Sequence, residues 1–264
     1  MKKALKKITR ATGLTRRHVA AARMYCERQW LATTSRARPT GRILCYHSVG
    51  QAAAGVNDVK PEQFRRQIEL ALRLGFRFVS AEQIARTDSA PTDLAITFDD
   101  GWTSVLSKAA PILRDYGIPW SLFVVSSWSD HRSTWAKEFI LPWREIDYLM
   151  ANGVKIGSHS ATHPDFGRLE RAQMTDELCS SREIIEQRLG FVPTSFAIPL
   201  GQSMNWSPLA GEIAREVGYE FIYAQAEETR PKDTIPRTFV TRFDHDRIFS
   251  ALLRGAFDRW EEWV

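Results

Sequence analysis

The segment LAITFDDGW, at residues 94–102, decides the fold and locates its chemistry. Its apolar run Leu94–Phe98 has the length and composition of a buried strand. Two carboxylates follow directly, and buried carboxylates at close range raise each other's pKa, which makes the pair costly. Gly101 lets the backbone turn sharply, so that Asp99 and Asp100 can point at one place. For this segment alone, an acidic turn that caps the next helix is the more ordinary interpretation.

Short apolar runs alternate with helical patterns on both sides of this segment. The runs predicted as strands are Arg42–His47, Phe76–Val79, Leu94–Phe98, Ser121–Val125, Lys155–Gly157, Ser195–Ile198 and Glu220–Tyr223. Between the first two, Pro61 and Gly75 mark the start and the end of a helix. This alternation predicts an α/β fold with a mostly parallel sheet. Periodicity does not decide whether the sheet stays open or closes into a barrel.

A second polar cluster, HSATHP at residues 159–164, also follows a predicted strand. A spacing of four residues between two histidines is frequent among metal ligands. Pro164 disfavours a helix at His163, so we expect a loop there. Because functional residues of α/β folds gather at the carboxyl ends of the strands, His159 and His163 can meet the acidic pair. One carboxylate with two imidazoles is a known ligand set for a divalent transition metal, although a lone HxxxH often arises by chance.

Two further strand ends carry weaker signals. The segment FAIPLG at residues 196–201 reads by itself as a strand and a turn. His47 ends the first predicted strand, where an ordinary core or surface histidine is the alternative. Four tryptophans lie in predicted loops near strand ends, and aromatic rings stack well on sugar faces, although core or rim packing is the better explanation for any single one. These four are Trp102, Trp128, Trp135 and Trp206.

Taken together, the motifs resemble the polysaccharide deacetylases, the NodB-homology group known as carbohydrate esterase family 4. TFDDG at 97–101, HSATHP at 159–164 and FAIPLG at 196–201 are similar to the first three motifs of that family, over about residues 40–255. The start of the sheet, YHSV at residues 46–49, resembles a subgroup with a YHxV strand. The resemblance implies a distorted (β/α)7-type barrel that removes N- or O-acetyl groups from sugars.

The resemblance also implies roles for individual residues. Asp99 takes the position of the general base, while Asp100, His159 and His163 take the positions of the metal ligands, with Zn²⁺ as the expected ion. Such a metal polarises a carbonyl and acidifies water, and a carboxylate that is not a ligand accepts the proton. The candidate substrate-binding residues are Trp102, Pro199, Gly201 and Arg237.

Two departures from the family pattern matter for the mechanism. Many members carry an arginine in the third motif that orients the base, whereas this chain has Ala197 there, and Arg237 is the candidate substitute. The Leu-x-His motif that members usually carry near the C-terminus is absent. His47 is therefore the candidate proton donor, since imidazole titrates near neutral pH, and His245 is the alternative.

The charge is distributed unevenly along the chain. Eleven Lys/Arg and one acid give residues 1–40 a net charge of +10, which leaves −5 for the remainder of a chain whose total is +5. We therefore expect a basic N-terminal helical extension at residues 1–39, a catalytic domain at residues 40–264, and no nucleic-acid partner. The extension lacks the continuous apolar stretch of a signal peptide, so we expect a cytoplasmic protein. Residues 1–38 either contact the inner face of the membrane or form a solvated arm, and we expect folding without them.

Three functions agree with these features. The first is a metal-dependent hydrolase acting on an acetylated glycan or polysaccharide. The second is hydrolysis of a non-sugar amide by the same chemistry, and the third is a non-catalytic glycan-binding protein with the same fold. Both carboxylates and both histidines are present, which argues against the third. The sequence predicts neither the sugar nor the oligomeric state.

Overall fold

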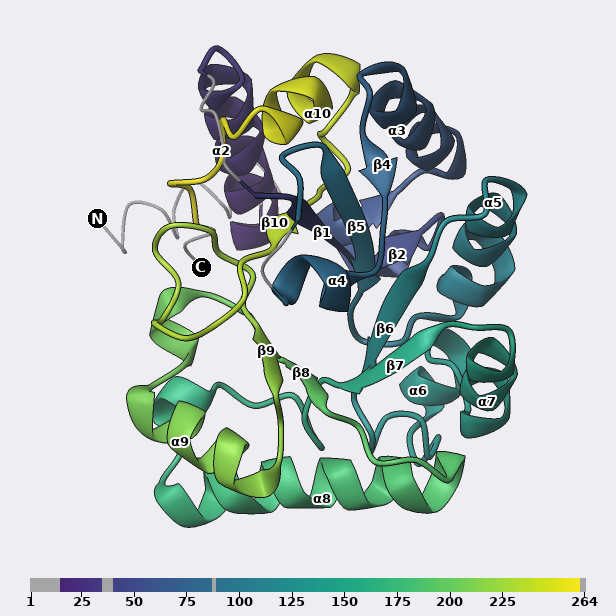
Figure 1. Cartoon of the computed structure of the whole chain (residues 1–264), viewed down its shortest axis with the longest axis vertical. Coiled ribbons are helices and arrows are strands. Elements are labelled where there is room, and N and C mark those ends of the chain that lie inside the picture. The colour runs from purple at the N-terminus through teal and green to yellow at the C-terminus, as the bar shows by residue number, and fades with distance from the viewer. Residues whose placement is uncertain (1–14, 35–39, 87–88, 262–264) are drawn as a thin grey trace.

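The computed structural model describes residues 15–34, 40–86 and 89–261 of the 264-residue chain. Its main element is a curled parallel sheet with the strand order β10-β1-β5-β6-β7-β8-β9, to which β4 adds by pairing with β5 (Figure 1). The strands are β1 (Arg42–Tyr46), β4 (Arg77–Phe78), β5 (Asp93–Phe98), β6 (Trp120–Val124), β7 (Lys155–Ser158), β8 (Ser195–Ala197), β9 (Phe221–Tyr223) and β10 (Thr238–Phe239). The predicted barrel-type α/β fold is confirmed, as a half-barrel with helices outside.

Helices surround the curled sheet, most of them on its outer surface, while the short α4 packs against the cluster inside the curl (Figure 1). They are α2 (Arg16–Leu31), α3 (Pro61–Arg73), α4 (Ala81–Ala85), α5 (Ala110–Asp115), α6 (Thr134–Phe139), α7 (Trp143–Ala151), α8 (Arg171–Leu189), α9 (Pro208–Val217) and α10 (Asp246–Leu253). A π-helical turn, Val105–Ala109, precedes α5. Short 3-10 turns lie at Ala52–Asn57, Phe166–Arg168 and Ser203–Asn205, and β2 (Ser48–Val49) pairs with β3 (Asp58–Val59).

The two-residue period of the strands separates an inner from an outer face. One buried cluster fills the inside of the curl with Ile43, Ala95, Phe123, Ala197, Phe221 and Tyr223. The neighbouring residues, such as Leu44 and Ile96, belong to the larger cluster beneath the helices. Because both faces are covered, β5 is buried along its whole length and reads as an apolar run in the sequence. Because of the same two-residue period, Ala95, Thr97 and Asp99 all lie on the inner face.

The first strand lies between β5 and β10, in the register Leu44 with Ile96 and Leu44 with Thr238. The sequence analysis did not identify β10, because two residues carry too little period to indicate a strand. This strand nevertheless matters for the site, since the residue that precedes it is Arg237. It therefore brings a guanidinium to the inside of the curl next to β1.

Helix α2 of the basic N-terminal segment contributes to the core, so this part of the segment is not a solvated arm. In α2, Arg28 is fully buried and donates hydrogen bonds to both carboxylate oxygens of Asp244. Its guanidinium also lies 4.3 Å from the centre of the Phe257 ring, and Met24 is buried nearby on the same helix. The division at residue 39/40 is one of charge, while the packing continues across it. Residues 1–14 and 35–39 lie outside the described residues.

None of the helices in the described segments combines the length and the apolar character needed to cross a membrane.

Candidate active site

The acidic pair lies where β5 ends, and its backbone conformation is unusual. The Asp99 amide donates to the Tyr46 carbonyl of β1 at 3.0 Å, which continues the sheet pairing to the edge. The chain then turns through Asp100 and Gly101, with φ angles of 71° and 84°. A positive φ is uncommon for a residue other than glycine and costs free energy, so it persists where the surrounding structure enforces it.

This strain is concentrated at neighbouring strand ends. Six non-glycine residues in the described part of the chain have a positive φ, and four of them follow β5, β7 and β8. The four are Asp100, Ser160, His163 and Leu200. Strained backbone at functional sites aims side chains in directions that relaxed backbone does not provide. The three sequence motifs therefore coincide with one strained edge of the sheet.

One carboxylate and two imidazoles converge at this edge, as the sequence predicted. Asp100 Oδ1 lies 3.6 Å from Nε2 of His159 and 3.6 Å from Nε2 of His163. The three candidate ligand atoms all lie within 4.8 Å of one another. Asp100 Oδ2 accepts a hydrogen bond from Trp102 Nε1 at 3.0 Å. Oδ1 is buried and accepts no hydrogen bond from any residue within the described segments.

The histidines are prepared for coordination by their surroundings. His159 Nδ1 lies 2.8 Å from the Ala197 carbonyl, which orients the ring and leaves Nε2 available. Burial lowers the pKa of His159 to about 4, against the opposing effect of the nearby aspartates, so the ring is neutral, as a metal ligand must be. The ring of His163 stacks on Trp128, with ring centres 5.4 Å apart. An unpaired carboxylate oxygen facing two imidazoles is a donor set that fits a divalent transition metal.

Asp99 lies deeper than Asp100 and has a different partner. Arg237 donates from Nη1 and Nη2 to its two carboxylate oxygens, each at 2.7 Å. The same guanidinium bonds the Ala224 carbonyl through Nε and the Thr97 hydroxyl through Nη1. Burial alone would raise the pKa of Asp99, but the positive charge of Arg237 outweighs it and holds this pKa well below its usual range. Asp99 is therefore a fixed, ionised carboxylate.

A buried thiol also contacts this carboxylate. Cys45 of β1 donates from Sγ to Asp99 Oδ2 at 3.3 Å, and burial raises its pKa, so it remains a neutral thiol. Cys45 belongs to no cysteine motif in the sequence, which has three cysteines far apart. The alternation of Ile43, Cys45 and His47 along the first strand was the signal that would have placed it on the inner face.

The two candidate proton donors lie in different surroundings. His47 is buried, and its ring nitrogen, Cys45 Sγ and the Asp99 carboxylate lie within 4.8 Å of one another. Its Nδ1 has no hydrogen-bond partner among the residues that the structure describes. His245 is exposed at the start of α10, with Nε2 3.1 Å from Gln29 Nε2 of α2. The structure thus brings His47 to the acidic pair and places His245 against the N-terminal helix.

The candidate substrate-binding residues occupy three kinds of position. Trp102 is buried and packs edge-on against Trp135, with ring centres 5.8 Å apart. Pro199 and Gly201 are buried, and a Cβ at residue 201 would lie 2.2 Å from Gln225 Cβ, so only glycine fits there. Arg237 is fully buried and engaged by Asp99. A direct substrate contact by Arg237 is incompatible with this burial, whereas its other predicted role, as the partner of the base, matches its position.

These features define a class of protein: a half-barrel hydrolase fold with an acidic pair and two histidines at the carboxyl edge of its sheet. The polysaccharide deacetylase family matches residues 86–222, which is just over half of the chain, and the chain belongs to that family. This membership confirms the predicted resemblance.

Individual relatives agree with this assignment. The chain is 23% identical to a putative polysaccharide deacetylase, YxkH, of Bacillus subtilis, over 72% of this chain and 66% of that protein. It is 26% identical to a chitin deacetylase of Pestalotiopsis, over 53% of this chain and 43% of that protein. The chain therefore spans about two thirds or less of the length of these curated relatives.

Solved structures share the fold. The deacetylase PplD of Streptococcus pyogenes, solved with acetate, superposes with a TM-score of 0.69 at 20% identity, over 81% of this chain and 99% of that one. IcaB of Ammonifex degensii also gives a TM-score of 0.69, at 21% identity, over 83% of this chain and all of that one. At this identity the likeness concerns the fold alone.

Proposed function

We propose that this chain is a metal-dependent hydrolase that removes acetyl groups from an acetylated glycan. The observation that carries the proposal is the unpaired Oδ1 of Asp100, which faces two imidazoles beside a second, ionised carboxylate. A structural role alone would leave a buried acceptor unsatisfied at a cost of about 1–3 kcal/mol. A bound cation removes this cost.

Asp100, His159 and His163 would hold the ion, and the mixed nitrogen and oxygen set favours zinc among the divalent metals. When bound, such an ion supplies a Lewis acid that polarises the acetyl carbonyl for attack. Trp102 contributes by donating to Asp100 Oδ2, which fixes the carboxylate with Oδ1 toward the imidazoles. The Ala197 carbonyl does the same for the His159 ring.

Asp99 acts as the general base in this proposal and accepts the proton of the attacking water. Its two bonds to Arg237 support the role, because they keep the carboxylate ionised and hold its orientation. They also lower its basicity, so Asp99 serves by position more than by proton affinity. The Asp99 carboxylate also compensates the buried positive charge of Arg237.

His47 donates the proton to the departing amine or alcohol. Its burial beside Asp99 and its unpaired Nδ1 support this assignment over His245, which contacts Gln29 on the outside of the sheet. An imidazole near a carboxylate gives and takes protons at neutral pH. Loss of turnover in His47→Ala with metal content intact is the expected result, and full turnover would return the role to His245.

The substrate is an acetylated sugar in this proposal because aromatic rings border the site. Trp135 is 39% exposed and contacts both Trp102 and Trp128, the latter of which stacks on His163. A sugar face packs well on such exposed rings. A non-sugar amide remains the second candidate substrate, and a substrate panel that compares acetylated oligosaccharides with acetylated amines separates the two.

The deciding experiment measures acetate release from N-acetylated oligosaccharides together with the metal content of the purified protein. We expect about one zinc-class ion per chain and acetate release that a chelator abolishes. A protein that binds the oligosaccharide but releases no acetate with metal present would be a glycan-binding protein, the remaining alternative.

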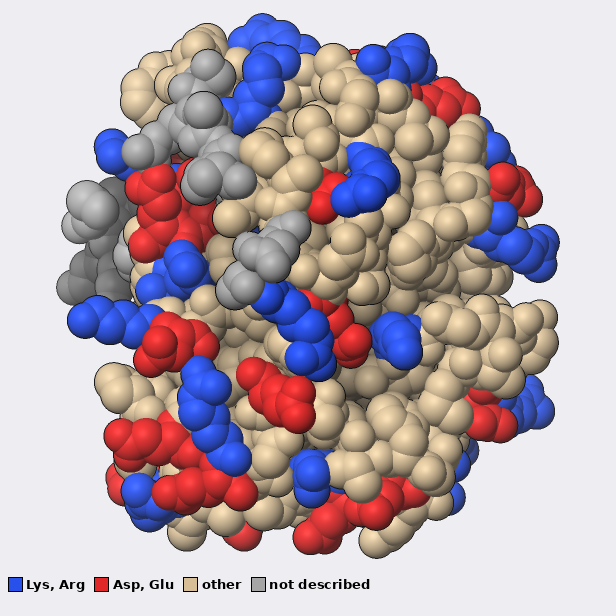
Figure 2. Space-filling view, in the orientation of Figure 1, with Lys and Arg blue, Asp and Glu red and all other residues tan. Residues whose placement is uncertain are grey.

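We also infer contact with an anionic membrane surface through the N-terminal region. Residues 1–40 carry a net charge of +10, and the outward face of α2 exposes Val19 and Trp30, the latter by 73%. Basic residues and interfacial tryptophan together favour such surfaces. No nucleic-acid partner is proposed: on the face shown in Figure 2, acidic and basic side chains intermingle and form no continuous basic surface. The cytoplasmic location remains a prediction.

A further inference from the structure

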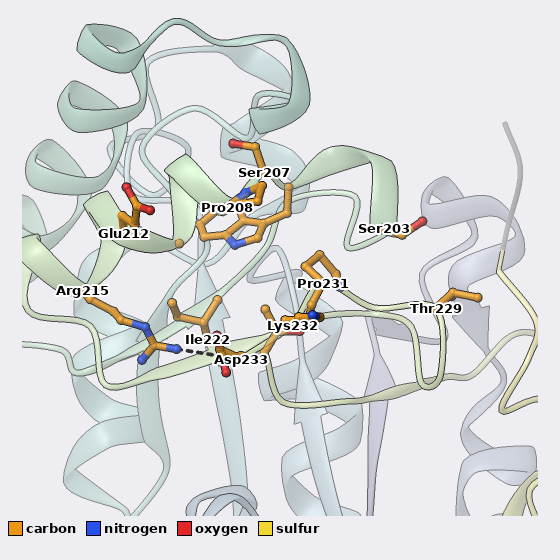
Figure 3. A pocket seen from close by; sticks show the side chains of 13 residues that line it. Ser203, Ser207, Pro208, Glu212, Arg215, Ile222, Thr229, Pro231, Lys232 and Asp233 are labelled. Atoms are coloured by element: carbon orange, nitrogen blue, oxygen red, sulfur yellow. Dashed lines mark hydrogen bonds between the residues drawn. The ribbon is translucent and has the colours of Figure 1, made fainter.

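A pocket of about 500 Å³ lies on the outer flank of the sheet, between α9 and the loop that follows β9 (Figure 3). Ile222 of β9 lines it from below, and since Phe221 and Tyr223 fill the inside of the curl, Ile222 faces outward. Segments 207–215 and 229–234 form the two sides. The volume is typical of small-molecule sites and exceeds that of one sugar ring. None of the acidic pair or the two histidines lines it.

The indole of Trp206 lines this pocket. Trp206 is only 5% exposed, and its ring packs against Phe166 and Phe196, with ring centres 5.1 Å and 5.5 Å apart. Its Nε1 is not one of the fully buried unpartnered atoms of the described segments, and it is open to the pocket beside Gly211. This N–H is therefore available to an acceptor that enters the pocket.

A glycine keeps this N–H accessible. Gly211 lies inside α9, where glycine is less favourable than alanine. A Cβ at residue 211 would meet one neighbour within 4 Å, Trp206 Nε1 at 3.5 Å. Helix geometry at Gly211 does not require a glycine, and neither does crowding. Its effect is to leave the indole N–H uncovered.

The rest of the lining is apolar with hydrogen-bonding groups of both charges. Pro208, Pro231 and Ile222 supply apolar walls. Glu212 and Lys232 are exposed at the pocket and form no ion pair or hydrogen bond with residues that the structure describes. Acidic and basic side chains also mix on the surrounding surface in Figure 2. With neither sign in excess, the lining favours a neutral ligand with apolar faces and several hydroxyls over a phosphate or a cation.

We propose that this pocket is a second carbohydrate-binding site, which holds a neutral sugar unit of the glycan away from the catalytic residues. The choice of a glycan rests on the proposed function. The Trp206 indole donates to a sugar hydroxyl, Glu212 accepts from one and Lys232 donates to one. A second binding contact with the same glycan chain raises the effective concentration of its acetyl groups at the strand ends.

The test is a titration that needs no turnover. Asp99→Asn protein with ¹⁵N-labelled tryptophan is titrated with the β-1,4-linked tetramer of N-acetylglucosamine, and the Trp206 indole signal is identified by its loss in Trp206→Phe. We expect this signal to shift saturably. Gly211→Leu should abolish the shift, and Glu212→Gln should weaken binding about fivefold. The matched control is Glu216→Gln, on the same helix but paired with Arg171 and outside the pocket, and it should bind as the parent does.

A Trp206 signal that stays fixed while other indoles respond would overturn the proposal, and so would unchanged binding in a folded Gly211→Leu. If the leucine variant does not fold, Gly211→Ala replaces it, because alanine favours the helix and its Cβ still covers Nε1. The deacetylated, positively charged tetramer should bind more weakly, and tighter binding would refute the neutral sugar. Absence of acetate release by the unmodified chain would refute the proposed function and leave this titration unaffected.

Discussion

Two regions of this molecule bury carboxylates, and they satisfy them differently. In the terminal region, where α2, α10 and the C-terminal segment meet, both oxygens of Asp244 accept from Arg28 and both oxygens of Asp258 accept from Arg42. At the strand ends, Asp99 is matched by Arg237 in the same way, but Asp100 keeps one buried oxygen unpaired. Buried charge therefore does not distinguish a functional site from a structural contact in this fold. Among these four carboxylates, Asp100 is the one with an unpaired oxygen.

The difference has an energetic meaning. A buried ion pair with good geometry roughly balances its desolvation cost, and breaking it by removing one partner costs about 3–5 kcal/mol. Substitutions in the terminal region should therefore reduce stability. At Asp100, stability is already reduced by the unpaired oxygen, so substitution should remove ligand binding instead.

The largest effect is expected at the acidic pair itself. Asp100→Asn should lose both metal and acetate release, because the amide is a poor ligand. Asp99→Asn should keep the metal while turnover falls about 10²–10⁴-fold, as loss of a general base requires. Metal content and initial rates are measured on the same preparations. If Asp99→Asn loses the metal and Asp100→Asn keeps it, the two roles are reversed.

Arg28→Ala should lower the free energy of unfolding by about 3–5 kcal/mol, because it leaves Asp244 charged and unpaired in the interior. Urea unfolding gives the value. Arg23→Ala is the matched control on the same helix: Arg23 is half exposed and pairs with Glu27, so its loss should cost less than about 1 kcal/mol. Metal binding by folded Arg28→Ala should equal that of the unmodified protein. An equal, small loss of stability in both variants would contradict the integral role of α2.

Arg237→Lys tests the ion pair between Arg237 and Asp99. This carboxylate is fully paired, as in the terminal region, but it lies at the strand ends. Lysine keeps the charge near Asp99 but cannot form the two parallel bonds, so the carboxylate loses its fixed orientation. We expect kcat to fall about 10–100-fold while metal content and KM stay unchanged. A rise in KM alone would instead indicate that Arg237 acts on the substrate.

The sequence predicted the strand-end region well because its chemistry lies in short segments with a regular period. The strand before Asp99, the loop at His159 and the turn at Gly201 were each identified from a few adjacent residues. The terminal region was not predicted, because its partners are far apart: Arg28 and Asp244 are 216 residues apart in the chain. Asp244 lies in a polar stretch of the sequence, and its neighbours give no sign that it is fully buried. Charge composition described the N-terminal segment as an arm, since composition does not show which arginine is buried.

The smallest expected effect separates the two faces of α2. Arg28 and Trp30 are two residues apart, yet Arg28 is fully buried while Trp30 is 73% exposed. Trp30→Ala should therefore leave the free energy of unfolding unchanged within about 0.5 kcal/mol. If this face lies on an anionic membrane, the substitution should weaken binding to anionic lipid vesicles by about 1 kcal/mol, roughly fivefold, through lost apolar burial. Vesicles without anionic lipid are the control and should bind both proteins poorly, because the basic charge of residues 1–40 has no counterpart there. Equal vesicle binding by both proteins would remove Trp30 from the membrane contact, and a large loss of stability would show that this face, like that of Arg28, belongs to the core.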